Sequence, residues 1–120
     1  FKVVGDTLPK IPDAEHIVAV NINDGTALGT IAAFEAAGRE EQLIVVSQGA
    51  DPSAQDEWVK EGSRFLGDTA YFPERYGSYI IPAMLDALEC RPLPPSIYVD
   101  HVFITKDNLC EHYPDHASCG

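Results

Sequence analysis

The chain has 120 residues, of which 45% are apolar, an amount that suits one hydrophobic core. Eight Lys and Arg side chains stand against nineteen Asp and Glu, which gives a formal net charge of −11. Such a charge repels the backbone of nucleic acid and anionic lipid surfaces. The apolar runs are far shorter than the roughly 20 residues that span a bilayer, and no basic and then apolar stretch opens the chain. We therefore expect one acidic domain without a nucleic-acid partner, a signal segment or a membrane insertion.

The first predicted unit is a strand followed by a helix. His16–Ile22 is apolar and β-branched without strong alternation, which predicts a strand covered on both faces. Asn23 and Asp24 follow it and can cap a helix, and Gly38 can end that helix in the left-handed conformation. This order is typical of the first half of a parallel strand–helix–strand unit.

A second strand and a second helix follow. Gln42–Ser47 predicts a buried strand and Gln48–Pro52 its exit loop. Ser53 has the position of a helix cap, and Gly62 marks the end of the helix. Trp58 on that helix could stack on a ligand, but a single Trp on an amphipathic helix more often packs against a sheet.

The third unit contains the clearest helical pattern. Asp68–Phe72 predicts a strand, and apolar side chains at helical spacing predict a helix over Tyr76–Leu88 that packs on the sheet. Pro82 lies within this pattern and predicts a kink or a late start. Ser96–Thr105 predicts a last strand, and the residues from Lys106 onward are polar and irregular.

The alternation of strand and helix predicts an α/β fold, a three-layer αβα lobe with a mainly parallel sheet of four or five strands and helices on both faces. In such sheets, ligands bind at the carboxyl ends of the strands. The loops at those ends are 23–26, 48–52 and 71–75.

Four segments in order carry a resemblance to a known family, and the most specific is the motif Asn-Asp-x-x-Ala-Leu-Gly at 23–29. The segments are Asn23–Arg39, Ile44–Ala54, Asp68–Leu88 and Tyr98–Asn108. Together they resemble the C-terminal lobe of type I periplasmic binding proteins, the sugar receptors of bacterial ABC transporters. LacI-type repressors share this fold in their ligand domains. The similarity covers roughly Pro12–Pro114, and it implies that residues 1–120 form a single lobe with an irregular tail over 107–120.

The resemblance implies a set of ligand-binding residues. The family's ligand-contacting Asn corresponds to Asn23, and Asp24 looks like the helix cap. The family often has an Asp after the next strand, which is either absent here or displaced to Asp51, so that Gln48 becomes a polar candidate. The family's Gln before a Pro corresponds most closely to Tyr71 or Phe72, ahead of Pro73, and Tyr71 is the candidate ligand residue. Without the resemblance, each of these residues has a plain structural role as a cap, a loop residue or a core aromatic.

The function implied by the resemblance is capture of a solute of the sugar class by one lobe of the extracytoplasmic receptor of an ABC importer. The partners would be the missing N-terminal lobe and the ABC permease, and the location periplasmic or extracellular. The alternative is the effector-binding domain of a LacI-type transcription regulator, and a third possibility is an enzyme on the same frame. No catalytic constellation or phosphate loop has a recognisable motif, so we expect neither catalysis nor a cofactor.

Two features leave alternatives open. Phe1–Gly5 could be a strand, but only about ten residues separate it from the strand near His16, so either the lobe is truncated or residues are missing before Ile11. In the tail, Cys110 and Cys119 can form a disulfide, remain free thiols or, with His112 and His116, bind zinc at a spacing that is not standard. The third cysteine, Cys90, is expected to be an unpaired buried thiol.

Overall fold

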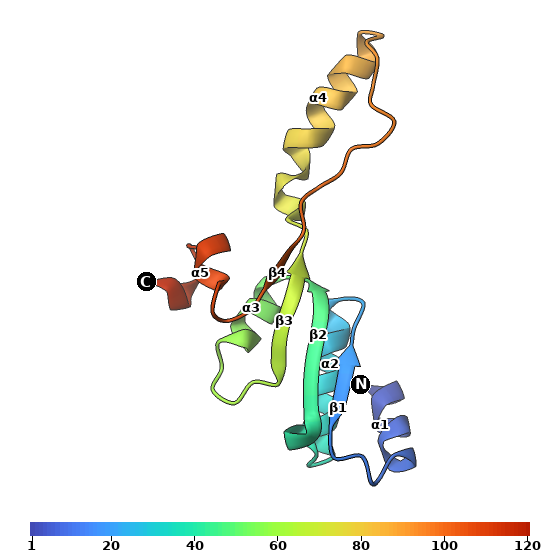
Figure 1. Ribbon diagram of the computed structural model, residues 1–120, viewed down its shortest axis with the longest axis vertical. Coiled ribbons are helices and arrows are strands. Elements are labelled where there is room, and N and C mark those ends of the chain that lie inside the picture. The colour runs from blue at the N-terminus through green and yellow to red at the C-terminus, as the bar shows by residue number, and fades with distance from the viewer.

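The computed structural model describes residues 1–120 and contains one four-stranded sheet with its helices (Figure 1). The strands are β1 (Ile17–Val20), β2 (Leu43–Gly49), β3 (Phe65–Ala70) and β4 (Val102–Ile104). The α-helices are α1 (Lys2–Thr7), α2 (Asp24–Ala36), α3 (Pro52–Trp58), α4 (Tyr76–Leu88) and α5 (Leu109–His112). Short 3₁₀ turns are η1 (Leu8–Lys10), η2 (Glu40–Gln42), η3 (Pro73–Arg75) and η4 (Ala117–Cys119).

The sheet has the order β1-β2-β3-β4 and is mainly parallel. Strands β1, β2 and β3 run in one direction, and β4 pairs with β3 in the opposite direction. This arrangement confirms the predicted α/β class and the parallel succession of the first three strands. None of the helices combines the length and the hydropathy that a membrane-spanning segment requires.

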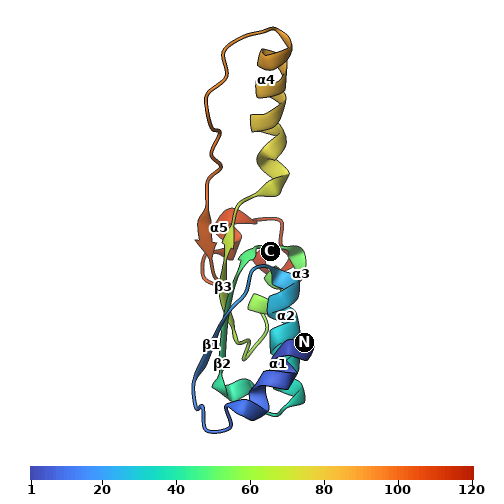
Figure 2. The same cartoon turned by 90° about the vertical axis from the view of Figure 1, so that its right-hand side faces the viewer.

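Helices cover one face of the sheet and leave the other face open (Figure 2). Leu43, Val45 and Phe65 are buried on the covered face, where α2 and α3 pack. Val20 is 81% exposed, although the sequence of β1 is as apolar as that of a buried strand. The expectation of helices on both faces is therefore not met within this chain. The sequence pattern showed that both faces of β1 are apolar, but it could not show whether these 120 residues supply the second cover.

Helix α2 begins and ends where the sequence predicts. The Asn23 side chain caps the helix, since its Oδ1 accepts a hydrogen bond from the Thr26 backbone N–H at 2.9 Å. Gly38 has a φ of 64°, which only glycine adopts at low cost. The prediction that Asp24 also caps the helix was wrong, because Asp24 is the first helical residue and its carboxylate turns toward the neighbouring loop.

Helix α4 projects away from the sheet, so the prediction that it packs there was wrong (Figure 1). It spans the predicted residues without interruption at Pro82, yet none of its residues is buried. The chain consequently extends 61 Å along its longest axis. Its apolar residues with large exposed areas are Tyr79, Ile80, Ile81, Met84, Leu85 and Leu88. An amphipathic pattern predicts that a helix face is buried, but not which part of a protein buries it.

Several predicted boundaries differ from those observed. Residues 1–5 do not form a strand, because most of them belong to α1, where Lys2 pairs with Asp6 one turn later. Helix α3 begins at Pro52 with Asp51 as its cap residue, rather than at Ser53, because proline is favoured at the first helical position. The third strand lies earlier than predicted and ends before Tyr71. The last strand is shorter than predicted and keeps only 102–104.

The core lies between the covered face of the sheet, α2, α3 and the tail. Trp58 is 2% exposed and packs edge-on against Phe65, with ring centroids 5.8 Å apart, which confirms the structural interpretation of this Trp. The tail is not wholly irregular, because it contains α5 and the fully buried Leu109. The tail therefore forms part of the folded body.

Candidate functional site

Three of the predicted ligand residues follow the carboxyl ends of the three parallel strands. Asn23 comes after β1, Asp51 after β2 and Tyr71 after β3. The last paired residues, Val20 with Val46 and Gly49 with Ala70, place these strand ends at one edge of the sheet. The structure thus brings Asn23, Asp51 and Tyr71 to the edge where ligands bind in parallel sheets.

The Asn23 side chain is only half used by the fold. Its Oδ1 accepts the capping hydrogen bond from Thr26, and its Nδ2 donates no hydrogen bond within the chain. The residue is exposed, so both Nδ2 protons are available to oxygen atoms of a ligand.

Asp51 and Tyr71 are neighbours that offer an acceptor and an aromatic surface. The Asp51 side chain is exposed and forms no hydrogen bond or ion pair. Burial and then the charge of Asp51 raise the pKa of Tyr71, so its phenol stays protonated at neutral pH. The Tyr71 ring lies 6.5 Å from that of Tyr76 and 6.4 Å from that of His101, measured between centroids. This cluster forms an aromatic wall beside a carboxylate.

Gln48 does not lie in the exit loop where the sequence placed it. Strand β2 continues to Gly49, so Gln48 is a strand residue, paired in register with Thr69. Its side chain is exposed on the same open face as Ile44. The strand is longer than predicted because its pairing with β3 continues through Gln48 with Thr69 and Gly49 with Ala70. Gln48 therefore lies one residue before the end of β2, and its side chain faces the open side of the sheet.

Two buried carboxyl groups lie directly beneath the loop that carries Asp51. Asp24 and Asp68 are both fully buried. Asp24 Oδ2 accepts the Asp51 backbone N–H at 2.7 Å, and Asp68 Oδ2 accepts the Ala50 backbone N–H at 3.3 Å. Burial, a hydrogen bond with Asp24 and the charge of Asp24 raise the pKa of Asp68 to about 8. Sequence analysis gave Asp24 only a capping role and did not single out Asp68.

Gly49 makes room for the Asp24 carboxylate. A Cβ at this position would lie 2.5 Å from Asp24 Oδ2, and the φ of 142° also disfavours a side chain. The close approach explains why a glycine ends β2.

The largest cavity, of about 580 Å³, lies beside the strand ends, between the loop after β2, η3 and the tail. Of the four predicted residues, only Asp51 lines it. Gln55, which sequence reasoning missed, and Arg75 of the predicted loop 71–75 also line it. The other side chains at its wall include Glu74, His112, Tyr113, Asp115 and His116. The histidines had stood out in the sequence only as part of a possible zinc motif.

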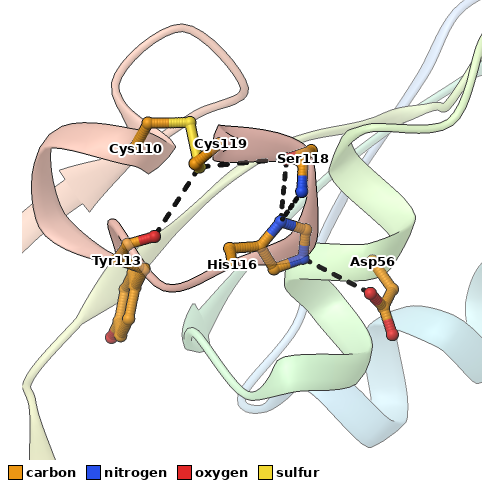
Figure 3. Close-up of a disulfide and its surroundings, with 6 residues drawn as sticks. All are labelled: Asp56, Cys110, Tyr113, His116, Ser118 and Cys119. Carbon is orange, nitrogen blue, oxygen red and sulfur yellow. Dashed lines mark hydrogen bonds and ion pairs between the residues drawn. A yellow bond between two sulfur atoms is a disulfide. The ribbon is translucent and has the colours of Figure 1, made fainter.

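A disulfide between Cys110 and Cys119 closes the tail that forms one wall of this cavity (Figure 3). Figure 3 shows the His116 ring between Ser118 and α3: Nδ1 lies 2.8 Å from Ser118 Oγ, and Nε2 lies 3.3 Å from the Asp56 carboxylate. Of the alternatives left open by the sequence, the structure forms the disulfide, which engages both tail thiols.

Aromatic packing joins the tail to η3, and the remaining cysteine lies elsewhere. The centroid of the Tyr113 ring lies 5.9 Å from that of the Phe72 ring. The Arg75 guanidinium lies 4.0 Å from the centroid of the same Phe72 ring, as in a cation–π contact. Burial and then the charge of Glu74 raise the pKa of Tyr113 to about 12. Cys90 is unpaired as predicted, but it is exposed rather than buried, because it follows the projecting α4.

The groups at the strand ends suit a neutral, polyhydroxylated molecule. The amide of Asn23 can donate hydrogen bonds, the Asp51 carboxylate can accept them, and the Tyr71 ring offers an apolar surface. Hydroxyl groups of a polyol both donate and accept, so they match this mixture. No group of three or more His, Cys, Asp or Glu side chains is placed to hold a metal ion.

Comparison with solved structures identifies the fold. The solute-binding protein of an ABC transporter from Agrobacterium vitis with bound allitol superposes with a TM-score of 0.84 at 24% identity, over 95% of this chain and 39% of its own. The Caulobacter myo-inositol-binding protein bound to myo-inositol superposes with a TM-score of 0.80 at 22% identity, over 94% of this chain and 38% of its own. A periplasmic solute-binding protein of an ABC transporter from Actinobacillus succinogenes with bound D-allose gives 0.77 at 22% identity, over 92% and 38%.

No protein-family model matches the chain, and neither does any curated protein sequence. The chain spans about two fifths of the length of the solved structures it resembles. The predicted resemblance is confirmed at the level of fold: this chain has the fold of a part of the solute-binding proteins of ABC sugar transporters.

Proposed function

We propose that this chain is a sugar-binding lobe of the solute receptor of an ABC importer. The observation that carries the proposal is the superposition, over nearly the whole chain, on receptors solved with allitol, myo-inositol and D-allose. All three ligands are neutral polyols, the class that the groups at the strand ends suit. The lobe acts by binding rather than by catalysis, and its place is periplasmic or extracellular, as for the Actinobacillus protein.

The two uncovered apolar surfaces support a second, missing lobe. One is the open face of the sheet with Val18, Val20 and Ile44, and the other is the apolar face of α4. Contiguous exposed apolar areas mark interaction sites in folded proteins. We therefore propose that residues 1–120 form one lobe. In contrast to the sequence-based expectation, α4 projects from this lobe and would pack on the remainder of the receptor.

A receptor of this kind closes around its ligand, so one lobe alone binds weakly. Each polar contact on an open, wet surface contributes about 0.5–1.5 kcal/mol, and three or four such contacts give a dissociation constant on the order of millimolar or weaker. The importer's permease would be the membrane partner of the closed receptor. The solved structures named above are transport receptors, which favours this function over the effector domain of a LacI-type regulator.

The proposal is tested by calorimetry on the two-lobed receptor and by NMR on this chain, with allitol, D-allose and myo-inositol as ligands. We expect micromolar or tighter binding by the receptor and millimolar binding by the chain, with amide shifts confined to Asn23, Gln48, Asp51 and Tyr71. Micromolar binding by the chain alone would show a site complete within one lobe. An absence of binding by the receptor to all three polyols would refute sugar capture.

Asn23 offers a matched pair of variants. Asn23→Asp keeps the oxygen that caps α2 and removes the Nδ2 donor, so the helix should remain stable while sugar binding weakens about tenfold. Asn23→Ala removes both groups and should also lower the free energy of unfolding by about 1 kcal/mol. Unchanged binding in a folded Asn23→Asp receptor would remove Asn23 from the site.

A further inference from the structure

The Asp24 and Asp68 carboxyl groups form a buried pair that the sugar contacts do not use. They come from different elements, α2 and β3, and both are completely shielded from solvent. Each accepts one backbone N–H of the loop after β2, at Asp51 and at Ala50. The second oxygen of each group, Oδ1, is buried and has no hydrogen-bond donor.

Two ionised carboxylates cannot occupy this place without compensation. No Lys, Arg or His forms an ion pair with either group. Buried charges normally have such a partner, and two like charges side by side disfavour a second ionisation. One proton shared by the pair removes one of the two negative charges. It also supplies a hydrogen bond between the two Oδ1 atoms that otherwise have no donor.

We propose that Asp24 and Asp68 share one proton and thereby position the loop Gly49–Asp51 at the candidate sugar site. The proposal rests on the proposed function only for the use of that loop. The two backbone N–H bonds fix the positions of Ala50 and Asp51, and the left-handed Ala50, with a φ of 66°, needs such support. Asp24 and Asp68 are positioning residues, since they act through the loop.

The surroundings keep the shared proton in place at neutral pH. Tyr71 at the end of β3 and Tyr113 in the tail are the titratable groups that interact electrostatically with the pair, and the exposed Asp51 side chain belongs to the loop that the pair holds. Asp51 adds a further negative charge and the two phenols are neutral, so none of them favours a second ionisation. The pKa of Asp68, about 8, agrees with this geometry.

Loss of the proton at alkaline pH should disturb the loop. With both groups ionised, electrostatic repulsion pushes the carboxylates apart. This movement weakens the hydrogen bonds that they accept from the backbone N–H groups of Ala50 and Asp51. Asp68→Asn imitates the protonated state at every pH, because the amide can donate to Asp24 and its oxygen can accept from Ala50. Asp13→Asn is the matched control, since Asp13 is exposed and forms no contact with the pair.

The test is an NMR titration of the chain from pH 5 to pH 10 without any sugar. We expect the Asp68 carboxyl carbon and the Ala50 and Asp51 amides to shift together in one step near pH 8. The step should persist in Asp13→Asn and disappear from the amides in Asp68→Asn.

The proposal is overturned if both carboxyl carbons titrate near the ordinary value of about 3.9, or if the amide step remains in Asp68→Asn. The wild-type carboxyl titration decides the matter even if Asp68→Asn fails to fold. Because no sugar is present, a failure here leaves sugar binding untouched, and a failure of sugar binding leaves the proton-sharing pair standing.

Discussion

Replacing Asp68 with asparagine should flatten the dependence of stability on pH. The folded chain holds the Asp68 proton up to about pH 8, because burial and the neighbouring Asp24 raise the pKa of this group. An unfolded chain releases the same proton at about pH 4. Between these values the folded state binds one more proton than the unfolded state, so its free energy of unfolding falls by about 1.4 kcal/mol for each pH unit. The contribution is fully present below about pH 4 and is lost by about pH 8.

Urea unfolding at pH 5, 6, 7 and 8 measures this slope. The only Trp, Trp58, is buried against Phe65 and reports unfolding by its fluorescence. From pH 5 to pH 7, wild type should lose about 3 kcal/mol relative to Asp68→Asn. Asp13→Asn should show the same dependence of stability on pH as wild type, because it leaves the Asp24 and Asp68 pair unchanged. The remaining acidic groups contribute equally to wild type and to the two variants. A constant difference between wild type and Asp68→Asn across this range would refute the reasoning.

Three further predictions concern the tail, α4 and the core. Cys119→Ser should leave the sheet folded but make residues 106–120 sensitive to limited proteolysis, since opening the nine-residue separation releases about 2–3 kcal/mol of chain entropy; Cys90→Ser, at an exposed free thiol, should change nothing. Met84→Lys should alter the free energy of unfolding by less than about 0.5 kcal/mol, and a larger loss would mean that α4 packs on the lobe in solution. Ile104→Ala, at a fully buried position, should lower the free energy of unfolding by about 2–4 kcal/mol in urea titrations.

The local elements of this fold could be predicted because their signals are local. The cap at Asn23, the left-handed Gly38 and the apolar spacing of 76–88 each depend on a few neighbouring residues, and each appears where the sequence places it. The ends of the strands were less predictable. A strand ends where its neighbour ends, so the length of β2 depends on pairing with β3, which no local pattern encodes.

The site could be predicted only in part, for the same reason. The resemblance directed attention to Asn23, Asp51 and Tyr71, which do lie at the ends of the parallel strands. Asp24 and Asp68 are 44 positions apart in the sequence and come together only when folding buries both. No local motif predicts this pairing. In a strand, Asp68 resembles a surface residue until its neighbours are known.

Many apolar residues that the sequence pattern predicts to be buried are exposed in this chain. The open face of the sheet and α4 have the composition of a core, and sequence reasoning treated both as buried. Fully burying one large apolar side chain stabilises a protein by about 1.5–3 kcal/mol, while a whole domain is stable by only about 5–15 kcal/mol. Covering even half of the six large apolar side chains on α4 would therefore stabilise the protein by an amount comparable to the stability of a whole small domain. The apolar pattern of this sequence is consequently best explained as part of a larger core, and the uncovered positions mark the surfaces on which the rest of the proposed receptor would pack.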